Sequence, residues 1–353
     1  MRGHRSRVFS FTRVLAAAAI AAAFTVVAHA HELVYVQATM TKNVYVIDAS
    51  NYRTVSTIPL GDYTYDVVGS PDGKLAFVAS QISAGSPLGW QVNEAGKVVA
   101  ISTATNTPVW ETAIDGSPHH MAMDPAGHTV YLAVFNRNYL YVLDAKSGTI
   151  LHRWYSTFGN HGVIVSKDGK RLYVGNMLND NIWVYDTETG RVVDILRTGE
   201  AVRPLVLDPD ESHVIYQLSR FHGFKVRDLK TGAVTSVDLP ALPAGTQMPD
   251  AYPFTVNHGL AVTPDGTKLL AAGSIGGYVA VYALPQYRLL GTIKVGDDPN
   301  WIVVRADSRI AFVTNRGSGS LSVLDLQNLK EIKQIPVGKM PQRLSMIDVA
   351  GRR

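Results

Sequence analysis

Short apolar runs recur along this chain at a nearly constant spacing. Seven of them share a pattern of alternating large apolar residues. They read VYVID, VVAIS, LYVLD, IWVYD, FKVRD, VAVYA and LSVLD, at residues 44–48, 98–102, 140–144, 182–186, 224–228, 279–283 and 321–325. Four of the six steps between them are 42 residues, and the other two are 54 and 55 residues. A repeat of this length, filled with strand patterns, is typical of a β-propeller blade.

Each repeat predicts four strands. A short apolar strand comes first and ends in a turn such as Ser70–Gly73, Lys167–Gly169 or Pro264–Gly266. An Asp-Gly pair between two apolar runs is a strong hairpin signal. A second strand follows, and the recurring run described above forms the third. After a further turn, a fourth strand completes the repeat. We therefore expect an all-β fold with seven blades of four strands each.

The two ends of the chain complement each other. The first repeat, which begins at Glu32, has no innermost strand, and the last segment, Pro341–Ile347, reads as an innermost strand with nothing after it. We expect them to combine into one blade, with three strands from the N-terminal end and one from the C-terminal end. Such a 3+1 clasp closes the ring and removes two open sheet edges.

Several repeats carry a recognisable signature. Tyr173–Asn176 reads YVGN, Phe312–Asn315 reads FVTN, and Asn43–Gly61 is similar to a complete repeat of this kind. The chain resembles the YVTN-family β-propeller repeat proteins over essentially all of its length after residue 30. The resemblance implies the propeller fold. It leaves the function open, because such propellers serve as binding modules, as partners in redox complexes and occasionally as enzymes.

Residues 1–30 have the pattern of a signal peptide. A start with four arginines leads into the apolar run Val14–Val27, and Ala28–Ala30 is a small-x-small cleavage site. The run is short for a membrane span, and we expect none after its removal. The sequence thus predicts a signal peptide at 1–30 and a seven-bladed propeller at 31–353, in a periplasmic or secreted protein.

Charge and cysteine content exclude several classes of function. The chain has 33 Lys and Arg and 29 Asp and Glu, and the four arginines before residue 30 account for the whole surplus. Nucleic acid is therefore not a favoured partner. The chain has no cysteine, which excludes thiolate metal sites and covalent haem attachment. It also lacks a Gly-x-Ser-x-Gly motif and a phosphate-binding glycine loop.

Aligning the repeats reveals a ring of polar residues at one position. Counting seven residues back from the Asp of the first turn reaches one residue in each innermost strand. These are Tyr65, His119, His161, Arg203, His258, Asn300 and, from the C-terminal strand, Arg343. Innermost strands surround the central channel, so we expect this ring at one mouth of the channel. Gly162 and Gly259 follow two of the histidines and would let the backbone approach a neighbour closely.

Two insertions account for the long steps. One is the loop Gln81–Lys97, which contains Trp90, and the other is the segment Pro240–Phe254. Alternating strand directions put both on the face that carries the ring, where a lid or pocket wall is expected. His222 lies in an inter-strand loop on the same face. We include Trp90 and His222 among the candidate ligand-binding residues.

Three interpretations of the ring remain open. In the first, its side chains bind only water, carbonyl groups and one another. In the second, His119, His161 and His258 hold a divalent metal such as zinc or copper. In the third, Arg203 and Arg343 pair with a small anionic ligand, while Tyr65 and Asn300 supply directional hydrogen bonds. Alternation along the strand predicts that His120, beside His119, points away from the channel.

The predicted function is binding of a small anion or a metal ion at the channel mouth. An alternative is a propeller enzyme of the lyase or lactonase type, with His119, His161, His258 or Tyr65 in metal- or His-assisted acid–base chemistry. Another is a partner subunit of a periplasmic redox system, with a protein partner in the periplasm. The sequence contains no complete set of catalytic residues that would identify the protein as an enzyme.

Overall fold

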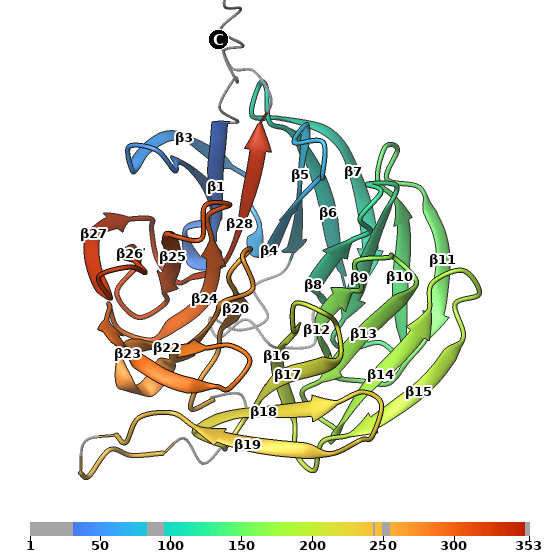
Figure 1. The fold of residues 1–353 in the computed structure, drawn as a ribbon. Helices are drawn as coiled ribbons and strands as arrows, with labels where there is room; N and C mark the ends of the chain where they lie inside the picture. The colour runs from blue at the N-terminus through green and yellow to red at the C-terminus, as the bar shows by residue number, and fades with distance from the viewer. Residues whose placement is uncertain (1–30, 83–94, 243, 249–254, 350–353) are drawn as a thin grey trace, which may run out of the picture.

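Seven four-stranded antiparallel sheets form a ring around a central axis (Figure 1). This architecture comes from a computed structural model, which describes residues 31–82, 95–242, 244–248 and 255–349. The predicted signal peptide, residues 1–30, lies outside these described residues. Within them, no helix is long and apolar enough to cross a membrane. The seven-bladed propeller expected from the repeat is confirmed.

The strands of each blade run from the axis outward in four ranks. The innermost rank is β4 (Tyr63–Gly69), β8 (Pro118–Met123), β12 (Asn160–Val165), β16 (Val202–Leu207), β20 (Leu260–Val262), β24 (Pro299–Val304) and β28 (Pro341–Val349). The second rank is β1 (His31–Ala38), β5 (Leu75–Gln81), β9 (Thr129–Val134), β13 (Arg171–Asn176), β17 (His213–Leu218), β21 (Lys268–Gly273) and β25 (Ile310–Asn315).

The outer two ranks complete the blades. The third is β2 (Asn43–Asp48), β6 (Ala95–Ser102), β10 (Tyr139–Asp144), β14 (Asn181–Asp186), β18 (Gly223–Asp228), β22 (Tyr278–Ala283) and β26 (Ser320–Asp325). The outermost is β3 (Arg53–Pro59), β7 (Thr107–Asp115), β11 (Ile150–Tyr155), β15 (Val192–Arg197), β19 (Val234–Asp238), β23 (Arg288–Lys294) and β27 (Lys330–Pro336). Two short 3₁₀ turns, η1 (Thr39–Thr41) and η2 (Ser274–Gly276), lie in the connections.

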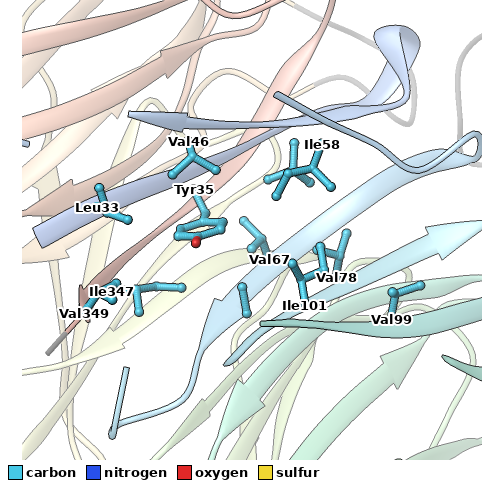
Figure 2. Packing of buried hydrophobic residues seen from close by; sticks show 12 residues of the cluster. Leu33, Tyr35, Val46, Ile58, Val67, Val78, Val99, Ile101, Ile347 and Val349 are labelled. Atoms are coloured by element: carbon cyan, nitrogen blue, oxygen red, sulfur yellow. The ribbon is translucent and has the colours of Figure 1, made fainter. Parts of the chain in front are cut away.

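The 3+1 clasp is present. The C-terminal strand β28 pairs antiparallel with β1, in a sheet ordered β28-β1-β2-β3. Figure 2 shows the packing between this blade and the next one. The fully buried ring of Tyr35 lies among aliphatic side chains of both blades, including Val67 from β4 and Ile347 from β28. The two ends of the chain are therefore joined through strand pairing and a shared apolar core.

Apolar packing holds each blade to its neighbours. The buried residues form seven clusters, one for each pair of adjacent blades. The strands of the outermost rank contribute little, since most of their side chains are exposed. Because burial of apolar area drives folding, this packing fixes the seven innermost strands around one axis. The fold thereby determines which side chains meet in the channel.

Several innermost strands begin with a bulge. The pairing register shifts between Thr64 and Asp66 in β4, and between Pro118 and Met121 in β8. Similar shifts occur at the starts of β12, β16 and β24. A bulge interrupts the regular alternation of side chains and redirects those beside it. Every one of these shifts lies next to the aligned ring of polar residues, at the same end of the channel.

Candidate functional site

All seven residues of the aligned ring meet in one cavity at the starting end of the innermost strands. Tyr65, His119, His161, Arg203, His258, Asn300 and Arg343 line it together, and each is buried. The cavity measures about 30 Å³, which is room for an ion or for one or two water molecules. The convergence expected from the repeat alignment is therefore present, and we call this space the histidine cavity.

His120 also lies in the histidine cavity, so the prediction that it points away is wrong. The bulge between Pro118 and Met121 breaks the alternation that the prediction assumed. As a result the consecutive residues His119 and His120 both project into the channel, with their ring centroids 4.3 Å apart. Four imidazoles share the cavity instead of three.

The Nε2 atoms of two of the four imidazoles lie close to the Nε2 atom of a third. The Nε2 atom of His161 is 3.3 Å from Nε2 of His120 and 3.4 Å from Nε2 of His258. His119 joins them, since one ring nitrogen each from His119, His120 and His161 lie within 4.8 Å of one another. The expected triad of His119, His161 and His258 is thus part of a larger group, which we call the four-histidine cluster.

Hydrogen bonds assign the tautomers of two of these rings. The Nδ1 atom of His258 is 3.1 Å from the backbone carbonyl oxygen of Asn300, which can only accept, so Nδ1 donates and Nε2 carries the lone pair. His120 accepts at Nε2 from a guanidinium N–H of Arg343, so its Nδ1 carries the proton. That Nδ1 faces Asp66, with its Oδ2 3.7 Å away.

The four imidazoles are held in the neutral form. Burial lowers the pKa of His119, His120, His161 and His258 well below the usual 6.5. The charge of Arg343 lowers each of these pKa values further. Neutral imidazoles keep a free lone pair, which is the state that a metal requires.

The Nδ1 atoms of His119, His120 and His161 have no hydrogen-bond partner among the described residues, although all three are buried. A buried polar atom without a partner costs free energy, so such atoms in a folded core call for an explanation. Their presence here counts against a network that exists only to satisfy its own polar groups.

Arg343 is the second notable feature of the channel. Its guanidinium lies over the ring of Trp301, 3.2 Å from the centroid, and donates to His120. No carboxylate is recorded within ion-pair distance of it among the described residues. Burial lowers the pKa of Arg343 to about 9, against the opposing charges of Asp66 and Tyr65, so the side chain is a cation at neutral pH.

Asp66 is a buried acid below the four-histidine cluster. Its Oδ1 accepts the N–H of Val67 at 2.8 Å, and its Oδ2 accepts the N–H of Met121 at 2.7 Å. Burial raises the pKa of Asp66 to about 6, in spite of the nearby charge of Arg343 and these two bonds. The carboxyl group lies on the Nδ1 side of His120, at 3.7 Å, which is beyond hydrogen-bond distance.

A second cavity continues the channel on the far side of the cluster. It measures about 120 Å³, and both His120 and Arg343 border it as well as the histidine cavity. Asp66, Trp301 and Ser345 contribute to its wall. The side chains of His120 and Arg343 therefore form a partition between two compartments of one channel.

Met177 and Arg203 close the histidine cavity on another side. The Nε of Arg203 donates to Ser219 Oγ at 2.9 Å, and its Nη1 lies 4.0 Å from the sulfur of Met177. Arg316 also borders the cavity, and its Nε donates to Asp298 Oδ2 at 2.6 Å. No acidic side chain is among the described residues that line this cavity.

The glycines after the histidines permit close backbone approaches, as expected. A Cβ on Gly162 would lie 2.5 Å from Leu205 Cδ2, and one on Gly259 would lie 2.9 Å from the carbonyl oxygen of Asn300. Gly259 also has a φ of +148°, which side chains rarely adopt. These approaches bring neighbouring innermost strands together beneath His161 and His258.

Two other sequence-predicted residues, His222 and Trp90, lie outside the cavity or outside the described residues. The ring nitrogen Nε2 of His222 contacts the carbonyl oxygen of Pro240 at 3.1 Å and the hydroxyl of Tyr278 at 3.0 Å, away from the residues that line the histidine cavity. Trp90 falls within 83–94, outside the described residues. Tyr65 packs on His119, with ring centroids 4.4 Å apart.

Asp66 and Met177 were not among the predicted site residues, and His120 was predicted to point away from the channel. Asp66 and His120 follow directly after two ring positions, so the same alignment shifted by one residue would have shown them as polar exceptions. Met177 follows strand β13, and the side chain of Asn176 fixes that turn by bonding to the carbonyl oxygen of Phe158 at 2.7 Å. Only the folded turn brings its thioether to the cavity.

Comparison with known proteins supports the repeat architecture. A family model described as outer membrane protein assembly factor BamB matches residues 41–158, which is a β-propeller repeat of that kind over about a third of the chain. The uncharacterized protein YwhL of Bacillus subtilis (strain 168) is 25% identical over 222 residues, covering 60% of this chain and 45% of YwhL. This chain therefore spans less than half the length of its curated relative.

Solved structures agree on the fold. The periplasmic gluconolactonase PpgL of Pseudomonas aeruginosa has a TM-score of 0.70 and 18% identity, covering 90% of this chain and 99% of PpgL. Kuenenia stuttgartiensis hydrazine synthase has a TM-score of 0.67 and 17% identity, with coverages of 82% and 91%. Dihydro-heme d1 dehydrogenase NirN has a TM-score of 0.61 and 16% identity, with coverages of 86% and 63%. At these identities the likeness establishes the propeller fold alone.

Proposed function

We propose that this protein is an exported propeller whose four-histidine cluster binds a metal ion. The spacing of the Nε2 atoms is the observation that carries the proposal. A tetrahedral centre with metal–nitrogen bonds of about 2.0–2.1 Å separates its ligand nitrogens by about 3.3–3.4 Å. The Nε2 atoms of His120 and His258 lie 3.3 and 3.4 Å from that of His161.

The surroundings of these rings support the same function. His258 donates its Nδ1–H to a backbone carbonyl, and His120 presents its Nδ1 to the carboxyl group of Asp66. The bond of His258 is typical of a ligand histidine, because an outer hydrogen bond fixes the tautomer and the direction of the lone pair. Asp66 lies on the corresponding side of His120, although 3.7 Å is too long for a hydrogen bond. Without a metal, the Nε2–H of His161 can donate to the free lone pair of His258 Nε2, while Arg343 donates to that of His120.

Arg343 must move for the metal to bind, since its guanidinium uses the lone pair of His120 Nε2. The far cavity of about 120 Å³ borders this side chain and gives it room to withdraw towards Asp66. Metal binding and an Arg343–Asp66 ion pair are thus compatible, whereas the present position of Arg343 and a metal on His120 are not.

A second candidate function is binding of a small anion, and the charge of Arg343 is the observation that favours it. This buried cation contacts a neutral imidazole and an aromatic face, neither of which neutralises it. A buried charge without a counter-charge is costly, and an anion would compensate it. The histidine cavity of about 30 Å³ admits an inorganic anion more readily than an organic one.

Binding without turnover fits the site better than catalysis. The gluconolactonase PpgL shares the fold, yet a lactone substrate does not fit the histidine cavity as the described residues arrange it. A redox partner role, suggested by neighbours such as NirN and hydrazine synthase, would make the same metal site an electron carrier. A periplasmic setting is supported by the signal-peptide pattern and by the likeness to PpgL, a periplasmic gluconolactonase.

Elemental analysis of the purified protein tests the metal proposal. After chelator treatment and supplementation with single metals, the wild-type chain should retain about one equivalent of a metal, and His161→Ala should retain none. His152→Ala, which removes an exposed imidazole on the outermost strand β11, is the matched control and should bind as wild type does. A folded wild-type protein that retains no metal under any supplementation would overturn the proposal.

The anion candidate is tested separately by thermal shift with phosphate, sulfate and formate. Stabilisation of the wild type that is lost in Arg343→Gln supports a role for the guanidinium. Equal shifts in both proteins reject it.

A further inference from the structure

We propose that the metal held by the four-histidine cluster is monovalent copper, with the thioether of Met177 as an additional ligand. This inference rests on the proposed function, because it names the metal for that same site. It depends on two observations that are independent of the nitrogen spacing: the donor atoms that border the cavity and the charges around it.

The donor set is soft and neutral. The histidine cavity is bordered by imidazoles and by Met177, and none of the described residues lining it is acidic. Hard cations such as Mg²⁺, Ca²⁺ and Mn²⁺ prefer carboxylate and carbonyl oxygens, so this lining disfavours them. Imidazole suits both zinc and copper, whereas a thioether selects Cu(I).

Met177 is positioned for this role by the turn that follows β13. Its own N–H donates to the carbonyl oxygen of Gly159 at 2.8 Å. The amide oxygen of Asn176 accepts the N–H groups of Leu178 and Asn179, each at 2.8 Å. The side chain of Met177 is buried and borders the cavity, and its sulfur accepts a long contact of 4.0 Å from Nη1 of Arg203, which a metal would have to replace. A methionine held in a fixed turn at the edge of four imidazoles forms a built position for a soft metal.

The positive charges of two arginines at the cavity favour a monovalent over a divalent metal ion. Arg203 and Arg343 are both buried at the cavity wall, and each carries a guanidinium, which stays positively charged in proteins. The repulsion between a metal ion and a fixed cation scales with the charge of the ion, so Zn²⁺ or Cu²⁺ suffers twice the penalty of Cu⁺. Low dielectric around buried groups strengthens this difference.

The carboxyl group of Asp66 does not remove this preference for a monovalent ion. Asp66 is the buried carboxyl group close to the cluster, but it lies in the far cavity and not among the residues that border the histidine cavity. It can pair with Arg343 once that side chain withdraws, which weakens the repulsion from Arg343 without abolishing it and leaves the charge of Arg203 in place. A single positive charge on the metal is then the arrangement with the least repulsion.

The test is a pair of competition titrations under anaerobic conditions. Cu(I) is titrated into the metal-free protein against bicinchoninate, and Zn(II) is titrated against a chromophoric zinc chelator. Three variants are compared with the wild type: Met177→Leu, Arg343→Gln and Met121→Leu. Met121 is the matched control, because it is a buried methionine that borders the far cavity and not the histidine cavity.

We expect Met177→Leu to lower the Cu(I) affinity at least about 10-fold and to leave the Zn(II) affinity within about 3-fold. Met121→Leu should change neither. Arg343→Gln should raise the Zn(II) affinity about 10-fold more than the Cu(I) affinity. It removes an electrostatic repulsion whose energy is twice as large for a dication as for a monocation. X-ray absorption of the Cu(I)-loaded protein should show a sulfur scatterer that is absent in Met177→Leu.

The failures of the two proposals are distinguishable. If neither metal binds the folded wild-type protein, the metal site itself is disproved. If Zn(II) binds and Cu(I) binds with no sulfur scatterer and no response to Met177→Leu, the site stands and the assignment to thioether-bound Cu(I) is wrong.

Discussion

Two groups of potential metal ligands lie at opposite ends of the innermost strands, and they differ in how their polar atoms are used. One is the four-histidine cluster at the starting ends. The other is the turn after β16, where Asp208, Asp210 and His213 come together beside a cavity of about 330 Å³.

In the turn, hydrogen bonds within the segment already satisfy the side chains. Asp208 Oδ1 accepts the N–H of His213 at 2.8 Å, and Asp208 Oδ2 lies 2.8 Å from His213 Nδ1. Ser212 donates its hydroxyl to Asp210 at 2.7 Å. The same turn recurs in other blades, for example where Ser166 bonds to Asp168 at 2.6 Å, so its polar residues serve the hairpin.

The cluster shows the opposite situation. Its imidazoles are buried, three of them have an Nδ1 atom without a described hydrogen-bond partner, and no turn or strand needs a polar residue there. Proximity of ligand atoms alone therefore does not identify a site. The comparison teaches that unused hydrogen-bonding capacity in a buried position is the more informative sign.

Removing two cluster ligands should have the largest effect on metal binding. His120→Ala/His161→Ala should weaken it by at least about 10⁴-fold, since loss of even an outer partner of a ligand commonly costs 10–100-fold. Asp208→Asn/His213→Ala, at the turn, should leave the affinity unchanged. Isothermal titration of both proteins, with circular dichroism to confirm folding, measures the difference. Equal affinities would remove the distinction drawn between the two groups.

Acid should unfold the metal-free protein through the cluster. The folded state keeps the pKa of the four histidines well below 6.5, mainly by burial, so below pH 6.5 the unfolded chain binds more protons. Stability should fall with decreasing pH, by up to about 1.4 kcal/mol per pH unit for each histidine.

Asp66 acts in the opposite sense within this range. Its pKa is raised from 3.8 to about 6 in the folded state, so its contribution favours folding as the pH falls through that window. Four histidines outweigh one acid, and the net slope should be positive with pH. Urea denaturation between pH 4 and 7 measures it, and His161→Ala should flatten the slope. A stability independent of pH in the wild type would show that the cluster is not held neutral.

The close approach beneath His258 should be sensitive to a single methyl group. Gly259→Ala would place its Cβ 2.9 Å from the carbonyl oxygen of Asn300, at a φ of +148°. We expect a loss of about 1–3 kcal/mol of stability, together with weaker metal binding, because the His258 Nδ1 contact with Asn300 would shift. Gly199→Ala is the control, since it has a φ of +77° but nothing within 4 Å of the added Cβ.

The smallest effect should come from the turn. His213→Ala removes one hydrogen bond from a partly exposed side chain and should cost about 1 kcal/mol. Thermal unfolding measures the loss, and metal content measured on the same samples should not change. A drop in metal content would show that the turn contributes to binding after all.

The blades were predictable from the sequence because four strands and their turns require a nearly constant number of residues. The clasp was predictable for the same reason, since Pro341–Ile347 continues the rank of innermost strands with no blade of its own. Aligning the repeats also brought Tyr65, His119 and the other ring residues to one level. The position of a strand within its blade, and of a residue along its strand, can therefore be predicted from the repeat spacing.

The composition of the site depended on local irregularities that counting does not contain. The bulge at the start of β8 turns His120 into the channel, and the equivalent shift in β4 accompanies the placement of Asp66. Met177 reaches the cavity through side-chain hydrogen bonds of Asn176, a contact between a strand end and its own turn. The regular alternation of side chains along a strand predicts neither these bulges nor the turn that Asn176 holds.

The pairing of β28 with β1 also decides which groups share the cavity. The four imidazoles are carried by blades whose strands are consecutive in the chain, whereas Arg343 is carried by β28, which completes the blade that begins with β1. The guanidinium therefore lies beside the histidines only in the closed ring. Selectivity by valence is thus a property of the ring and not of any single blade.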